Sequence, residues 1–185
     1  MSVKTIVKNA LILFVITLLS GLLLGVAYQI TKGPIAERQA RGKKEAYQSV
    51  FSEAQSFEED DAINGYGISG VTVTECLKAV DGSGTLLGYV MTLDFAGSQG
   101  EITMAYGEAV DGTTMGIDIL TSSETAKLGA LADEPEFKDQ FQTKTDEFVL
   151  NDNIDQISGA TITSNAVVNA ANGGMAFAAY CAKGE

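Results

Sequence analysis

The fold is decided by residues 71–121, which read VTVTECLKAVDGSGTLLGYVMTLDFAGSQGEITMAYGEAVDGTTMGIDILT. This stretch contains four segments rich in β-branched and aromatic residues, a composition typical of strands. Asp81-Gly82 and Asp111-Gly112 lie between them and are typical of tight turns, the latter of a hairpin. We therefore predict a meandering, mainly antiparallel sheet. Its strands are expected at residues 71–80, 86–95, 101–110 and 114–121.

Helices are expected on both sides of this region. After it, residues 135–141 predict a short helix, 147–150 a short strand and 164–180 an alanine-rich helix with an apolar face at helical spacing. Gly173 and Gly174 argue against the full length of that last helix. The fold class that follows is α+β.

The N-terminal part of the chain predicts one membrane span. Residues 10–30 carry no charge and have the length that crosses a hydrocarbon core, in contact with lipid. A signal peptide usually has a shorter apolar region, and Tyr28 and Lys32 suit interfacial anchors, which favours a retained helix. A second helix is expected from Pro34 to Phe51, followed by an exposed acidic connection over residues 52–69. We divide the chain into residues 1–32 (tail and span), 33–68 (helix and connection) and 69–185 (the domain).

Composition excludes several classes of function. The chain has 185 residues and a net charge of −12, which disfavours nucleic-acid binding. It contains no histidine, so Ser-His-Asp and Cys-His catalysis and most zinc sites are ruled out. Cys76 and Cys181 lie too far apart in sequence for a close-spaced metal motif. We expect both to be buried apolar residues, with a disulfide as the less favoured alternative.

A first candidate segment, residues 151–164, leads into the last predicted helix and contains Ser158-Gly159-Ala160-Thr161. Hydroxyls and backbone N–H groups at a helix N-terminus favour a phosphate. Simple helix capping by Ser or Thr explains the same residues, and local chemistry alone favours capping. In so acidic a domain, a freely exchanging phosphate ligand would bind weakly, whereas a covalent tether removes that difficulty.

A second candidate segment, residues 122–130, follows the strand expected at 114–121. Its small and polar residues suit a loop against a ligand, but an ordinary connection is an equally simple interpretation. Lys127, one of few positive charges here, either lies near a ligand or pairs with a carboxylate.

Together, the N-terminal span, Glu124-Thr125-x-x-Leu128-Gly129 and Asp155-x-x-Ser158-Gly159-Ala160-Thr161 resemble the FMN-binding domain family, most closely the RnfG branch found in Rnf electron-transport complexes. The resemblance implies FMN joined as a phosphoester to Thr161 by a dedicated flavin transferase. Asp155, Ser158, Gly159 and Ala160 match the transferase recognition sequence, and Thr163 is the alternative acceptor.

The same resemblance implies that Glu124, Thr125, Leu128 and Gly129 lie near the isoalloxazine ring. Ala126 and Lys127 replace the Pro-Gly usual in this loop, and the usual histidine before it is absent.

The implied function is electron transfer within an ion-translocating ferredoxin:NAD oxidoreductase of the Rnf type. The chain would then be an electron-carrying subunit with partner subunits, rather than a free-standing enzyme with catalytic or metal-binding residues of its own. The family places the domain outside the cytoplasm. The positive-inside count opposes this, because Lys4 and Lys8 precede the span and five basic residues follow it closely.

Two alternatives remain at this level. The first is the flavin subunit of a sodium-pumping NADH:quinone oxidoreductase, which is usually a longer chain. The second is a non-catalytic anchored binding module in which residues 158–161 merely cap a helix.

Overall fold

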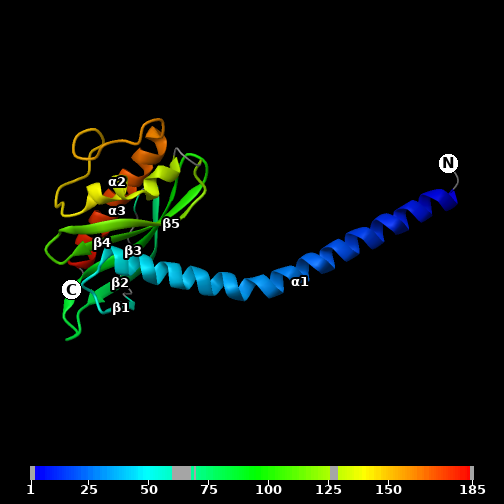
Figure 1. Ribbon diagram of the computed structural model, residues 1–185, viewed down its shortest axis with the longest axis horizontal. Coiled ribbons are helices and arrows are strands. Elements are labelled where there is room, and N and C mark those ends of the chain that lie inside the picture. The colour runs from blue at the N-terminus through cyan, green and yellow to red at the C-terminus, as the bar shows by residue number, and fades with distance from the viewer. Residues whose placement is uncertain (1–2, 60–67, 69, 126–128, 184–185) are drawn as a thin grey trace. The chain divides into compact units, whose positions relative to one another are not determined.

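The computed structural model describes residues 3–59, 68, 70–125 and 129–183. Their contacts divide the chain into two units, residues 1–42 and 43–185, and the second is called the domain below. In chain order, the elements are α1 (Val3–Val50), β1 (Ser56–Glu59), β2 (Val71–Val80), β3 (Leu86–Ala96), β4 (Glu101–Ala109), β5 (Thr114–Ser122), η2 (Gly129–Asp133), α2 (Pro135–Lys138), η3 (Asp139–Phe141) and α3 (Thr161–Cys181) (Figure 1).

The sheet is a five-stranded antiparallel meander in the order β1-β2-β3-β4-β5. The four predicted strands and the α+β class are confirmed. Both predicted turns are present, since the Asp81 carboxylate accepts the N–H groups of Ser83 and Thr85, and that of Asp111 accepts the N–H of Thr113.

β1 was missed, because residues 52–69 read as an exposed connection. Glu58 and Glu59 are exposed on this edge strand, where charge protects the open edge from further pairing. Only Phe57 turns partly inward, with its ring 5.8 Å from that of Tyr47. The rest of the acidic run, from residue 60, lies outside the described residues.

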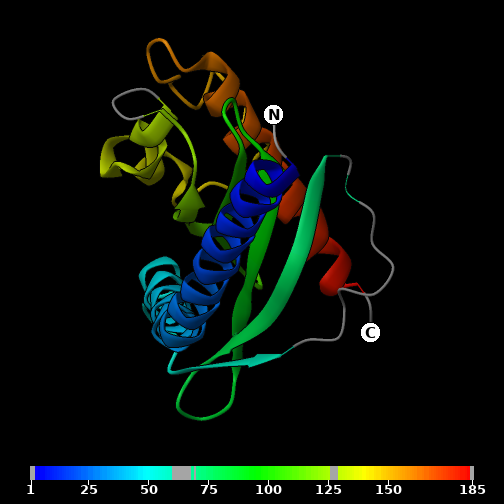
Figure 2. The same cartoon turned by 90° about the vertical axis from the view of Figure 1, so that its right-hand side faces the viewer.

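The two faces of the sheet are covered by different helices (Figure 2). α3 packs on one face with apolar side chains from the middle of the sheet, among them Met91, Met104 and Tyr106. The last turns of α1 pack on the other face through Tyr47, Val50 and others. Cys76 and Cys181 are buried, as expected.

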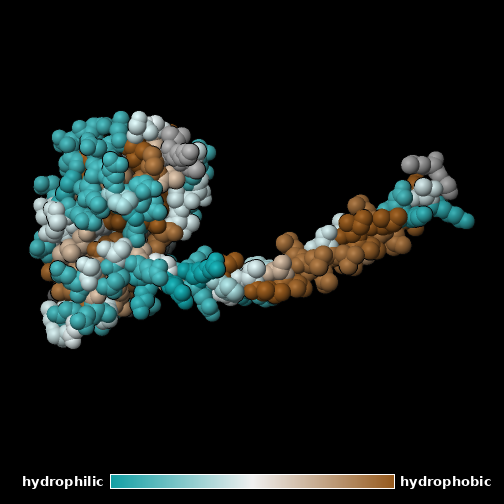
Figure 3. All heavy atoms as spheres, viewed as in Figure 1, coloured by the Kyte–Doolittle hydropathy of each residue, from teal (hydrophilic) through white to brown (hydrophobic). Residues whose placement is uncertain are grey.

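α1 runs through the predicted boundary at Pro34 as one helix of 48 residues. Proline has no N–H to donate to the carbonyl four residues earlier, and it crowds the Cβ of the preceding residue. That residue is Gly33, which has no Cβ, so part of the steric cost is absent. The prediction that a new helix begins at Pro34 was therefore wrong. The N-terminal part of α1 is long and apolar enough to cross a membrane, and its apolar surface contrasts with the hydrophilic surface of the domain (Figure 3).

The predicted strand at residues 147–150 does not form; only Leu150 makes an isolated bridge, to Ile154. Side-chain amides take the place of a strand partner here. Asn172 bonds both the N–H and the carbonyl of Phe148, while Asn153 accepts from the Val149 N–H and donates to the Glu147 carbonyl. Local periodicity carries no information about such distant amides.

α3 continues through Gly173 and Gly174, against the sequence expectation, because Gly174 lets the helix approach the sheet closely. A Cβ at Gly174 would lie 2.6 Å from Cδ1 of Tyr106. Tyr106 is fully buried, and its hydroxyl donates to Glu108 at 2.7 Å and lies 3.0 Å from the Thr114 hydroxyl. The ring therefore has little freedom to move aside.

We expect Gly174→Ala to lower the free energy of unfolding by roughly 1–2 kcal/mol, the overpacking cost less the gain in helix propensity. Gly173→Ala is the matched control. Its Cβ meets only Cγ2 of the half-buried Ile68, at 2.9 Å, so the helix-propensity gain should offset most of the cost. Thermal unfolding in detergent measures both, and a larger loss for Gly173→Ala would contradict this packing argument.

Candidate flavin site

The Ser158-Gly159-Ala160-Thr161 segment forms a tight turn directly before α3. The Ala160 N–H donates to the Ile157 carbonyl at 3.0 Å, and Gly159 has φ +78°, a conformation that favours glycine. The Ser164 hydroxyl accepts from the Ile157 N–H and donates to the Ala160 carbonyl, both at 3.0 Å. The turn is thus fixed to the first turn of the helix.

Thr161 is the first residue of α3 and is exposed, and its hydroxyl donates to Oε1 of Gln156 at 3.3 Å. The N-cap residue is Ala160, which makes no side-chain capping bond. The capping interpretation favoured by local sequence was therefore wrong. The first N–H groups of a helix lack carbonyl partners, so this end of α3 keeps its donors for an anion.

Glu124 joins the two candidate segments. Its Oε2 accepts a hydrogen bond of 2.8 Å from the Thr163 hydroxyl, and its Oε1 accepts the Gln99 N–H at 3.0 Å. Gly129 packs so closely that a Cβ there would lie 2.2 Å from Oε2. The carboxylate thus ties the β3–β4 turn and the loop after β5 to the first turn of α3.

The other predicted site residues are placed as follows. Thr163 is buried, whereas Asp155, Ser158 and Gly159 are exposed. Thr125 is exposed and accepts the Ala130 N–H through its carbonyl. Leu128, like Lys127 and Ala126, lies outside the described residues.

A groove of about 840 Å³ lies beside the attachment segment. One wall comes from η2, α2 and Gln140, and the other from residues 155–158. Its lining residues are Leu131, Glu134, Pro135, Glu136, Phe137, Gln140, Asp155, Gln156, Ile157 and Ser158. The volume is in the range of ligand pockets.

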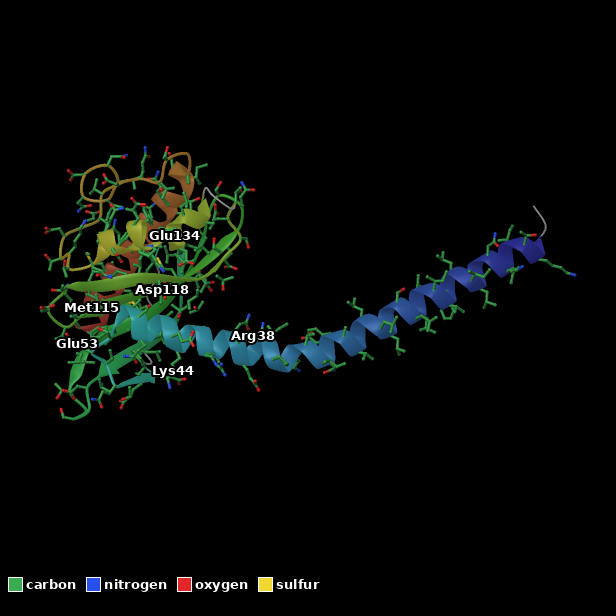
Figure 4. The ribbon with its side chains drawn as sticks, in the orientation of Figure 1. Arg38, Lys44, Glu53, Met115, Asp118 and Glu134 are labelled. Carbon is green, nitrogen blue, oxygen red and sulfur yellow. The ribbon has the colours of Figure 1, made fainter. Side chains whose placement is uncertain are left out.

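Two polar side chains hold the first wall in place. Lys138 donates to Asp118 on β5 at 2.6 Å and to Asp133 on η2 at 2.9 Å. Burial lowers the pKa of Lys138, but these bonds outweigh it and leave the pKa above its ordinary value. Asp118 also accepts from Ser49 at the end of α1, at 2.9 Å (Figure 4). Gln140 connects the two walls, because its Oε1 accepts the Asp155 N–H at 2.6 Å.

Sequence reasoning missed Gln99, Gln140 and Lys138, which are far from both motifs along the chain. Gln156 lies inside the first segment, but only the structure shows that its side chain meets Thr161.

Comparison with known proteins identifies the family. A family described as the RnfG N-terminal region matches residues 1–50, and one described as the FMN-binding domain matches residues 97–176. The G subunit of the ion-translocating oxidoreductase complex of Methanosarcina acetivorans is 36% identical over 90% of this chain and 91% of its own length. The chain belongs to the RnfG family. The resemblance inferred from the motifs, including its FMN-binding domain, is confirmed.

Other relatives agree with this RnfG assignment. The G subunit of the Na(+)-translocating ferredoxin:NAD(+) oxidoreductase complex of Acetobacterium woodii is 33% identical, covering 91% of this chain and 89% of its own. The crystal structure of Shewanella oneidensis NqrC matches with a TM-score of 0.51 and 20% identity, over 75% of this chain and 73% of that one. That likeness concerns the fold alone.

Proposed function

We propose that this RnfG-family chain carries FMN as a phosphoester on Thr161 and relays electrons within a membrane-bound ferredoxin:NAD oxidoreductase that translocates ions. The observation that carries the proposal is an exposed threonine at the start of a helix whose N-cap makes no side-chain capping bond. The names of the relatives support the membership in such a complex and, with it, partner subunits.

The attachment reaction is assigned to a flavin transferase acting on FAD. The Thr161 oxygen forms a bond to the FMN phosphorus, the pyrophosphate bond breaks, AMP leaves, and the hydroxyl proton is lost. Thr161 suits this role because its hydroxyl is accessible and makes only one long hydrogen bond. Thr163, the alternative acceptor, is buried and bonded to Glu124, which speaks against it.

Once bound, the flavin supplies one-electron chemistry, while the protein positions it and tunes its potential. The N–H groups of α3 would hold the phosphate, and Glu124 would keep that helix end in place through Thr163. The test is fluorescence of the chain after denaturing electrophoresis. Flavin fluorescence on the chain is expected, and a dark band would favour an anchored module without flavin.

We also propose that α1 anchors the chain and that the domain lies outside the cytoplasm, since long domains translocate largely regardless of charge. Glu58 lies exposed on β1, and both native cysteines are buried, so Glu58→Cys provides a label site with little background. An impermeant maleimide is expected to label this variant in intact cells. Labelling only after the cells are opened would place the domain in the cytoplasm.

A further inference from the structure

We propose that the groove between η2–α2 and residues 155–158 holds the isoalloxazine ring of the tethered flavin, and that its acidic rim lowers the reduction potential of that ring. This inference rests on the proposed attachment to Thr161. It assigns the ring a binding surface and gives a role to carboxylates that lie outside both sequence motifs.

The groove is reached directly from the attachment point. Gln156 lines the groove, and its Oε1 is the acceptor of the Thr161 hydroxyl. Formation of the phosphoester removes the proton that Thr161 donates, so the Gln156 amide loses this partner. It is then available to a polar group of the ligand, on the same side of the helix end that the groove occupies.

The lining of the groove suits a flat aromatic ring with a polar edge. Leu131, Pro135, Phe137 and Ile157 supply apolar contact. Gln140 is already bonded to the Asp155 N–H at 2.6 Å and to the Glu136 carbonyl at 3.2 Å, so it fixes the separation of the two walls. A groove with fixed walls spends little ordering entropy on its ligand.

The rim of the groove carries the carboxylates of Glu134, Glu136 and Asp155, all on exposed residues. The nearest lysine of this wall, Lys138, is engaged by Asp118 and Asp133. A flavin gains electrons on reduction, and negative charge nearby raises the energy of the reduced form. The rim therefore favours the oxidised flavin, and it also repels free FMN, which makes the covalent bond necessary for occupancy.

The experiment compares two charge-matched double variants of the full chain, produced together with a flavin transferase. Glu134→Gln with Glu136→Gln removes two charges from the rim. Glu53→Gln with Glu147→Gln removes two exposed charges that do not line the groove. Intact mass reports the flavin adduct, and a spectroelectrochemical titration reports the midpoint potential.

The adduct is expected in all chains, and the potential is expected to rise in the rim variant while it stays near wild type in the control. Equal potentials in the two variants would overturn the proposal. A missing adduct in wild type would instead refute attachment itself, so the two failures are distinguishable.

Acrylamide quenching of flavin fluorescence is a second, independent measurement. Leu131→Ala opens the groove and should increase the quenching constant. Val149→Ala, a similar truncation at an exposed apolar residue that does not line the groove, should leave it unchanged. Equal quenching in wild type and Leu131→Ala would show that the ring lies elsewhere.

Discussion

Thr161→Ala is expected to abolish covalent flavin completely while the fold is retained. The substitution removes the only oxygen to which the phosphoester is assigned. It costs the fold little, because the side chain is exposed and makes one hydrogen bond of 3.3 Å, and alanine is a good helix former. Intact mass and fluorescence after denaturing electrophoresis measure the adduct, and circular dichroism measures the fold.

Thr163→Ala is the matched control. It removes a hydroxyl two residues away that is buried and donates to Glu124. The adduct is expected to persist in this variant, although the fold loses some stability through the unpaired carboxylate oxygen. An undiminished adduct in Thr161→Ala would move the acceptor to another hydroxyl, of which Ser158 is the nearest exposed one along the chain.

Glu108→Gln is expected to flatten the dependence of stability on pH. Glu108 is 5% exposed on β4, and burial raises its pKa from 4.5 to about 7, with a further increase from Asp111 and an opposing effect of the Tyr106 hydroxyl. A carboxyl group with a raised pKa holds its proton more tightly in the folded state. Its contribution, on the order of 3 kcal/mol, is full below pH 4.5 and is lost as pH rises through 7.

Wild type should therefore lose stability between about pH 5 and pH 8, whereas Glu108→Gln, which still accepts from Tyr106, should not. Thermal unfolding of the detergent-solubilised chain at several pH values measures this difference. Glu53→Gln, an exposed neutralisation, is expected to follow wild type. Parallel slopes for wild type and Glu108→Gln would show that another group is responsible.

Much of the fold follows from local sequence. The segments at residues 71–80, 86–95, 101–110 and 114–121 carry strand-forming side chains, and the Asp-Gly turns between them fix the antiparallel order. The places where prediction failed share one cause, which is that partners distant along the chain decide the outcome. β1 forms because β2 offers an edge, and residues 147–150 stay irregular because Asn153 and Asn172 take their backbone groups.

By itself, the sequence determined the membrane span, the strand order, the exclusion of histidine chemistry and the family, because periodicity, composition and short motifs are local properties. Only the tertiary structure decided that Ala160, and not a hydroxyl residue, is the N-cap of α3, that Glu124 ties the two motif segments together, and that an acidic groove adjoins Thr161. These depend on the distances between segments separated by tens of residues, and folding sets those distances when α3 packs on the sheet.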